Sequence, residues 1–258
     1  MSTPSVLVNY WRQSACARAF WGQQEVPAYR ELLVDTKAWL NPRPGERWLD
    51  LGCGCGKLTQ ALWEKSGGEL AQVIGIDCAA ENDRAFRRLR AVLTPAPTEG
   101  QFQFLQRDFS AGLSDWTTEH FDGVVSGLAI HYAESYSPER GCWTTEAYDR
   151  LLGEVFRVLR GDGSFVFSVI VPEPAWGKLA WHSWPGVFSA VRPLHFLKRA
   201  WRMMSYGPWL KQQARRGRFH YLPLETIARK LTTIGFGDIQ HRLSYAGQAY
   251  LIRCHKPA

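Results

Sequence analysis

A glycine-rich turn between a short apolar strand and a helix constrains this chain more than any other feature. Residues 47–59 read RWLDLGCGCGKLT, with a strand expected at 47–51 and a helix from about Lys57. Glycine stands at every second position from Gly52 to Gly56, so no side chain blocks a ligand that approaches the backbone. The first turn of the helix would point its free amide groups at that ligand. The spacing is Gly-x-Gly-x-Gly and differs from the Gly-x-Gly-x-x-Gly of nicotinamide enzymes.

Strands and helices alternate after this turn, which predicts a parallel, doubly wound sheet with ligands at the carboxyl ends of its strands. A closing helix at 223–233 and a hairpin of strands 239–245 and 249–255 are expected to follow. The fold class is therefore α/β, a Rossmann-like sheet of seven strands, mostly parallel with a C-terminal antiparallel hairpin, plus an N-terminal helical cap and a helical insertion. The other predicted strands are 71–77, 101–106, 121–126 and 164–171, and the other predicted helices are 57–65, 79–93 and 144–160.

We expect one domain of 258 residues with four parts. Residues 1–43 form the helical cap, and residues 44–172 form the ligand-binding core. Residues 173–220 are an insertion of short helices over the carboxyl edge of the sheet, and residues 221–258 close the fold. No stretch approaches the roughly 20 uninterrupted apolar residues of a membrane-spanning helix, and no signal peptide is expected.

The net charge of +7 is concentrated in the insertion, which also holds five tryptophans. No acidic residue lies between Glu173 and Glu225, so like charges there would repel unless an anionic partner is near. Tryptophan with arginine or lysine is also the composition of interfacial helices. We expect either a lid that faces an anionic or membrane-borne partner or a lid whose tryptophans form its own small core. The nine basic residues are Lys178, Arg192, Lys198, Arg199, Arg202, Lys211, Arg215, Arg216 and Arg218.

The six cysteines are scattered along the chain, and Cys53 and Cys55 lie inside the glycine turn. Thiols in such a place indicate a reducing compartment and favour a cytoplasmic protein over a disulfide-bonded one. The spacing of this pair and the absence of a second pair differ from structural zinc sites, so we expect no metal.

Residues at the ends of successive strands resemble the class I S-adenosylmethionine (SAM)-dependent methyltransferases. The segment 50–56 (DLGCGCG) resembles motif I of that family, and Asp77 stands 21 positions beyond Gly56 at the end of the second strand. Asp108-Phe109 follow the third strand, and segments 121–126 (FDGVVS) and 154–165 stand in register with the same family.

The resemblance implies SAM as cofactor and assigns roles to these residues. Asp77 would accept the two ribose hydroxyls, Asp108 with the next amide would hold the adenine, and Asp50 would lie near the methionine part. The alternatives are a helix N-cap for Asp77 and a plain turn residue for Asp108. The predicted cofactor-binding residues are Asp50, Gly52, Cys53, Gly54, Gly56, Asp77, Cys78, Asp108, Phe109, Ser126, Gly127 and Leu128.

Segments 128–132 and 220–223 resemble small-molecule methyltransferases, including quinone-biosynthesis C-methyltransferases. We therefore expect methyl transfer to oxygen or carbon of a small molecule, hydrophobic or anionic, which the protein aligns and shields from water. A base is needed only if the acceptor loses a proton. His131, just past the fourth strand, is the candidate base, with Tyr132 beside it as a second candidate. A loop histidine without a role is the alternative.

Two other functions stay open. The basic, aromatic insertion would suit an RNA or other nucleic-acid methyltransferase. Against this, the fourth strand ends Ser126-Gly127-Leu128-Ala129, whereas enzymes that methylate base amino groups usually carry Asn or Asp, two prolines and an aromatic there. A non-catalytic SAM-binding protein is the second alternative. The sequence identifies neither the acceptor nor the oligomeric state.

Overall fold

A seven-stranded sheet organises the chain in the order β3-β2-β1-β4-β7-β9-β8. The computed structural model describes residues 9–12, 18, 21–183 and 206–258. The pairs β1–β2, β2–β3, β1–β4 and β4–β7 are parallel, and β7–β9 and β8–β9 are antiparallel. The predicted α/β class and C-terminal hairpin are therefore confirmed. The strands are β1 (Arg47–Leu51), β2 (Gln72–Asp77), β3 (Phe102–Gln106), β4 (Phe121–Gly127), β7 (Leu159–Ile170), β8 (Gly237–Ser244) and β9 (Ala249–His255).

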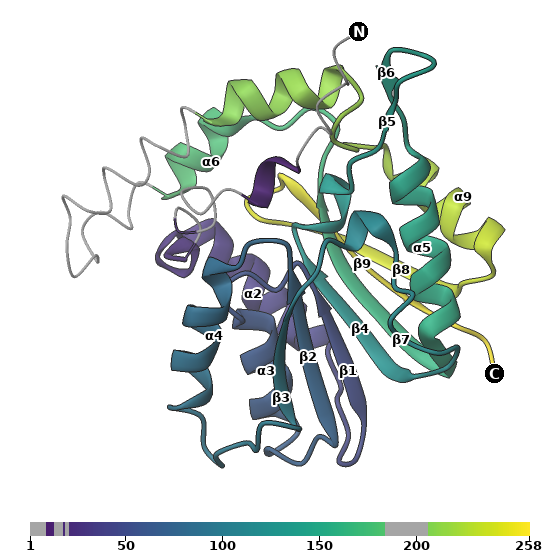
Figure 1. Ribbon diagram of the computed structural model, residues 1–258. Helices are drawn as coiled ribbons and strands as arrows, with labels where there is room; N and C mark the ends of the chain where they lie inside the picture. The colour runs from purple at the N-terminus through teal and green to yellow at the C-terminus, as the bar shows by residue number, and fades with distance from the viewer. Residues whose placement is uncertain (1–8, 13–17, 19–20, 184–205) are drawn as a thin grey trace, which may run out of the picture.

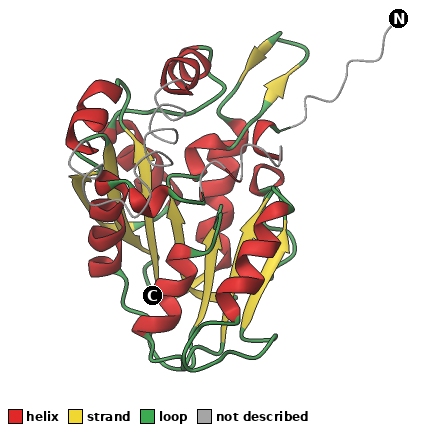
Figure 2. Ribbon diagram, turned by 90° about the vertical axis from the view of Figure 1, so that its left-hand side faces the viewer, coloured by secondary structure: helices red, strands yellow, loops and turns green. Residues whose placement is uncertain are grey.

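Helices cover both faces of the sheet (Figures 1 and 2). Side chains of a strand alternate between faces, so Trp48 of β1 packs on one side while Leu49 and Leu51 pack on the other. All three are nearly or fully buried, as a strand between two helical layers requires. One face carries α2 (Pro27–Trp39), α3 (Lys57–Lys65) and α4 (Glu81–Arg90), and the other carries α5 (Glu146–Val158) and α9 (Leu224–Ile234).

The predicted bounds of helix 144–160 and strand 164–171 are wrong where they meet, because α5 ends at Val158 and β7 begins directly after it at Leu159. The backbone at the start of β7 pairs with β4 on one side and with the residue after β9 on the other. Leu159 pairs with Phe121 before the ladder shifts register, and the Asp162 amide donates to the Lys256 carbonyl at 2.9 Å. Asp162 takes a positive φ of 61°, which absorbs the irregularity inside the strand.

Several short elements lie at the carboxyl ends of the parallel strands. Of the predicted N-terminal helical cap at 1–43, the structure describes the helix α2 and two 3-10 turns, while 1–8, 13–17 and 19–20 lie outside the described residues. A two-stranded hairpin, β5 (Tyr136–Ser137) with β6 (Cys142–Trp143), was not predicted. Of the insertion, the structure describes α6 (Trp176–Ser183) and a helix over 206–215, while 184–205 lie outside the described part. The 3-10 turns are η1 (Tyr10–Arg12), η2 (Gln23–Glu25), η3 (Phe109–Ala111) and η4 (Ile130–Tyr132).

The two tryptophans of the insertion whose side chains the structure describes pack against the main fold. Trp176 and Trp209 pack against a buried cluster that also contains Leu32 of α2, Ile170 of β7 and Ala249 of β9. The helix at 206–215 is therefore attached to the main sheet and to α2. Trp184 and Trp201, and the side chain of Trp181, lie outside the described residues.

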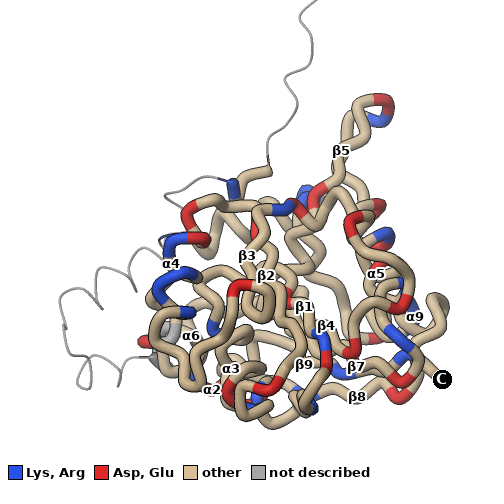
Figure 3. Tube along the Cα trace, turned by 60° about the horizontal axis from the view of Figure 1, so that its bottom comes forward, with Lys and Arg blue, Asp and Glu red and all other residues tan. Residues whose placement is uncertain are grey.

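Three positive charges of the insertion are paired with acids, two with Glu173 at its first position and one with Glu134 outside it. Lys211 and Arg215 lie against Glu173, the latter at 3.9 Å, and Arg218 pairs with Glu134 at 2.8 Å. The expectation that these charges lack acidic partners is thus wrong for these three. Basic residues also gather along α4, on the outer side of the fold (Figure 3). Within the described ranges, no helix has the length and apolarity needed to cross a membrane.

Candidate cofactor and acceptor site

The glycine turn after β1 is fixed to its neighbours by close backbone contacts. The Gly52 and Cys53 amides both donate to the Ile76 carbonyl of β2, at 2.9 and 3.0 Å. A Cβ at Gly52 would lie 2.3 Å from Cβ of Ala129, so only glycine lets this turn touch the loop after β4. Gly54 differs, because a Cβ there would meet nothing within 4 Å. The turn is therefore packed at its base and open at its centre, where a ligand can approach the backbone.

Asp77 ties this turn to the start of the next helical segment. Its Oδ2 accepts a hydrogen bond from the Gly54 amide at 3.0 Å, and its Oδ1 accepts one from the Ala79 amide at 2.9 Å. Burial raises the pKa of this carboxyl above its ordinary value, against the effect of these hydrogen bonds. Each carboxylate oxygen offers more than one acceptor position. The hydrogen bond to Ala79 does not cap α4, whose N-cap position is Ala80, so the alternative role of Asp77 as its N-cap is wrong. The carboxylate keeps capacity for ribose hydroxyls.

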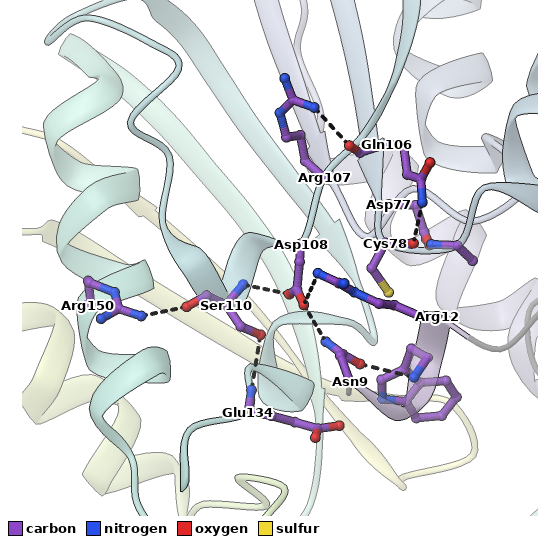
Figure 4. Close-up of polar contacts among 12 residues, drawn as sticks. Asn9, Arg12, Asp77, Cys78, Gln106, Arg107, Asp108, Ser110, Glu134 and Arg150 are labelled. Carbon is purple, nitrogen blue, oxygen red and sulfur yellow. Dashed lines mark hydrogen bonds and ion pairs between the residues drawn. The ribbon is translucent and has the colours of Figure 1, made fainter. Parts of the chain in front are cut away.

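Asp108, at the end of β3, is held by residues from two parts of the chain (Figure 4). Its Oδ1 accepts the Ser110 amide at 3.0 Å, which caps η3. Its Oδ2 accepts Nδ2 of Asn9 at 3.0 Å and lies 3.5 Å from Nη2 of Arg12. The sequence analysis did not find Asn9 and Arg12, because no local pattern links them to an acid about a hundred residues away.

Asp50 is a buried acid beneath the glycine turn, with 1% of its surface exposed. Thr59 Oγ1 donates to its Oδ2 at 2.6 Å, while Oδ1 has no hydrogen-bond partner within the described chain. Burial raises the pKa of Asp50 to about 7. Tyr29 of α2 is partly buried near it, and loss of solvent together with the charges of Cys55 and Asp50 raises the pKa of that phenol. An unpaired buried oxygen at this point suits a cationic or hydrogen-bond-donating ligand group.

The loop after β4 lies at the same edge of the sheet as the loops after β1, β2 and β3. Ser126 Oγ donates to the Leu51 carbonyl at 2.8 Å, and the Leu128 amide donates to Oγ of Ser168 at 3.0 Å. Leu128 has a positive φ of 52°, which turns the chain away from the sheet. The adjacent strands β3, β2, β1 and β4 thus bring the predicted residues to one edge of the sheet: Asp50, Gly52, Cys53, Gly54, Gly56, Asp77, Cys78, Asp108, Phe109, Ser126, Gly127 and Leu128.

The end of the insertion is joined to the loop after β4 by contacts that we call the clasp, between residues 131–134 and 218–221. The Arg218–Glu134 ion pair is largely shielded from water, with side-chain exposures of 14% and 6%. The clasp fixes the predicted residues His131 and Tyr132 against the insertion. Its remaining contacts are the His220 amide to the His131 carbonyl at 2.8 Å, His220 Nε2 to the Ala133 carbonyl at 2.8 Å, and the Tyr132 and Tyr221 hydroxyls at 3.3 Å.

His131 lies inside the clasp as a neutral, fully buried ring. Neither ring nitrogen has a hydrogen-bond partner in the described part of the chain. Burial, and then the charge of His220, lower the pKa of His131 to about 3. Burial raises the pKa of Tyr132 to about 12, against the effect of its contact with Tyr221. Both predicted catalytic residues are therefore uncharged near pH 7, and the imidazole offers one donor and one acceptor.

Five aromatic rings from three segments meet beside the clasp, and we call them the five-ring cluster: Tyr10, Trp11, Tyr132, Trp209 and Phe219. The ring centroids of Trp11 and Tyr132 lie 4.5 Å apart, those of Tyr132 and Phe219 4.8 Å, and those of Tyr10 and Trp209 4.3 Å. The guanidinium of Arg218 lies 5.9 Å from the Tyr10 ring centroid and 5.7 Å from that of Phe219. Tyr10 and Trp11 belong to the N-terminal turn η1.

Comparisons with known proteins agree with this geometry. The methyltransferase domain family matches residues 49–167. None of the curated proteins compared with the chain matches it significantly.

Among solved structures, a SAM-dependent methyltransferase from Mesorhizobium loti is 19% identical, with a TM-score of 0.53 over 86% of this chain and 96% of that one. An O-methyltransferase family protein from Burkholderia thailandensis is 12% identical, with a TM-score of 0.58 over 95% and 61%. A phosphoethanolamine N-methyltransferase from Haemonchus contortus is 14% identical, with a TM-score of 0.61 over 95% and 58%.

The sheet order, the site and these matches define a class I SAM-dependent methyltransferase. Residues 49–167 belong to the methyltransferase domain family, and the matched SAM-dependent methyltransferases support SAM as the cofactor. The glycine turn fits this cofactor, because Gly54 leaves an open approach and the buried Asp50 Oδ1 lacks a partner among the described residues. Within those residues, no group of three or more His, Cys, Asp or Glu could hold a metal ion.

Asp50→Asn should remove a pH-dependent loss of stability from the cofactor-free protein. The pKa of Asp50 is raised from 3.8 to about 7 in the fold, so the folded chain holds a proton that the unfolded chain has lost. Stability therefore falls as the pH rises through this interval. We expect the free energy of unfolding of the variant, minus that of the wild type, to grow between pH 5 and pH 7.5 in urea titrations. Parallel pH curves for the two proteins would contradict this assignment.

Arg218→Met should lower the free energy of unfolding by about 3–5 kcal/mol, because it leaves Glu134 buried without its partner. Arg218→Lys keeps the charge but loses the planar contacts with the rings, so a smaller loss is expected. Arg216→Met, at an exposed position two residues away, is the matched control and should change stability by less than about 0.5 kcal/mol. Urea unfolding measures all three, and an Arg218→Met variant as stable as the control would exclude the clasp as a stabilising contact.

Proposed function

We propose that this methyltransferase transfers the methyl group of SAM to oxygen or carbon of a small, largely apolar molecule. The observation that carries the proposal is the five-ring cluster beside the loop after β4, next to the neutral ring of His131. Aromatic walls favour a planar or apolar acceptor through stacking and burial. The nearest arginine, Arg218, is already paired with Glu134, so it offers little to an anionic acceptor.

The roles of the chain's own residues in binding SAM follow from their positions. Asp77 would accept the ribose hydroxyls, Asp108 the adenine amino group, and the free oxygen of Asp50 would face the methionine ammonium group. SAM itself supplies an activated methyl group on a sulfonium, so the protein contributes alignment and exclusion of water. The buried rings of His131, Phe219 and His220 in the clasp would supply that exclusion on the acceptor side.

His131 is the proposed group for an acceptor that must lose a proton. A neutral imidazole can accept a hydrogen bond from a hydroxyl, and its lone pair is unused within the described chain. Because its pKa is already low, the ring stays neutral through the physiological range. The burial also means that an acceptor reaches it only when the clasp or its covering rings shift.

The kind of molecule that receives the methyl group distinguishes this proposal from a nucleic-acid methyltransferase and from a non-catalytic SAM-binding protein. Incubation with labelled SAM and metabolite, lipid or RNA fractions should transfer label to small organic molecules. Transfer to RNA would favour a nucleic-acid methyltransferase, and SAM binding without any transfer would favour a non-catalytic SAM-binding protein. Contact with an anionic membrane stays a prediction, and so does a cytoplasmic location, which the five free cysteines among the described residues support.

Asp77→Ala should weaken SAM binding by roughly tenfold to a hundredfold, because two ribose hydroxyls lose their acceptor. Since Asp77 also holds the Gly54 amide, the sharper test uses S-adenosylhomocysteine and its 2′-deoxyribose analogue in calorimetry. The wild type should discriminate between the two ligands, and Asp77→Ala should not. Equal discrimination by both proteins would move the ribose away from Asp77, while the melting temperature of the variant reports any damage to the turn.

His131→Ala should lower turnover by roughly a hundredfold and leave SAM affinity unchanged. In the wild type, turnover should show no acid limb near pH 6.5, because the buried ring is already neutral there. Both are measured by initial rates once an acceptor is known. Normal turnover in the variant would leave alignment as the whole contribution of the protein, and an acid limb near pH 6.5 would contradict the buried state of His131.

A further inference from the structure

Residues 9–12 contact the carboxylate of Asp108, the acid that is expected to bind the adenine of the cofactor. Both donors on Oδ2 of Asp108 come from this segment, the Asn9 carboxamide at 3.0 Å and the Arg12 guanidinium at 3.5 Å (Figure 4). The Asp108 side chain is only 14% exposed, so little of it is left to solvent. The other oxygen, Oδ1, accepts the Ser110 amide. A third planar donor could reach Oδ2 only in competition with these two.

The orientation of the Asn9 carboxamide is fixed by its own backbone. Oδ1 of Asn9 accepts the Trp11 amide at 3.0 Å, so Nδ2 must be the atom that faces Asp108. The Arg12 amide donates to the Asn9 carbonyl at 3.1 Å and closes the 3-10 turn η1. This turn presents an amino group to Asp108, the same kind of donor as the exocyclic amino group of adenine.

Arg12 also lies close to Cys78, the residue that follows β2. In Figure 4 its side chain lies between Asp108 and Cys78, and its positive charge acts on both. Cys78 and Asp108 follow neighbouring strands, and the space between their loops is where the proposed function places the adenine. A flat guanidinium with donors at its edge thus stands where a flat purine with an amino group is expected.

We propose that η1 fills the adenine subsite of the cofactor-free chain, and that SAM binds by displacing Asn9 and Arg12 from Asp108. The inference rests on the proposed function, which assigns Asp108 to the adenine. It makes these two residues competitors of the cofactor, so the apparent affinity is reduced by the fraction of molecules in which they hold Asp108.

The same turn connects the cofactor to the acceptor side. Between Asn9 and Arg12 stand Tyr10 and Trp11, whose rings belong to the five-ring cluster. A short turn moves as a unit, so release of Asn9 and Arg12 shifts Trp11 against Tyr132 and Phe219. SAM binding thereby loosens the cover of the acceptor site, and the acceptor binds second.

The test is the affinity of SAM for the variant Asn9→Ala/Arg12→Ala, measured by calorimetry on the full chain. If the two residues compete with SAM, the variant binds it about 5- to 50-fold more tightly than the wild type. In stopped-flow binding, the observed rate should level off with SAM concentration in the wild type and stay linear in the variant. Arg18→Ala is the matched control, because it removes another N-terminal arginine, which pairs with Glu81 at 3.5 Å and not with Asp108, and it should leave affinity unchanged.

The outcomes separate this inference from the proposed function. Weaker or unchanged SAM binding in the double variant would overturn the competition and make the segment part of the bound site or a bystander. No SAM binding by the wild type and tight binding by the variant would support it most strongly. No binding by either protein would overturn both proposals. If the double variant does not fold, Arg12→Gln alone, at a side chain 54% exposed, should still tighten binding by a smaller factor.

Discussion

The carboxylate of Asp77 is the contact on which the arrangement of the site depends. It joins the amide of Gly54 in the first loop to that of Ala79 in the second, so two loops that follow neighbouring strands keep one geometry. The glycine turn could not hold this shape by itself, because glycine backbones have many accessible conformations. Burial makes the charged carboxylate costly, and the two amides offset that cost. A ligand that adds donors to Asp77 therefore meets an acceptor that is already positioned.

The acceptor side is built by contacts between segments far apart in the sequence. The clasp joins the loop after β4 to the end of the insertion, and the five-ring cluster adds the N-terminal turn. Because Arg218 contacts Glu134 and lies over the rings of Tyr10 and Phe219, one side chain serves both. The turn η1 thus contacts both the proposed adenine subsite, through Asn9, and the proposed acceptor side, through Trp11.

Most of the sheet could be predicted from the sequence, because it rests on local signals. Alternation of strands and helices, acids at strand ends and glycines at the turn identify β1, β2 and β3 with their residues within a position or two. The partners of these acids were not predictable. Asn9 reaches Asp108 across the fold, and Glu134 neutralises Arg218 from outside the interval that lacks acids. Charge counted along the sequence therefore overstated the unpaired charge of the insertion.

The central claim is that the carboxyl ends of β1, β2 and β3 hold SAM, and hydrogen–deuterium exchange with and without SAM tests it most directly. The account predicts slower exchange in three separate segments, the glycine turn at 52–56, the loop at 77–79 and the loop at 108–110. Exchange in β8 and α9, on the far side of the sheet, should not change. Protection confined to other segments, or none at saturating SAM, would contradict the account.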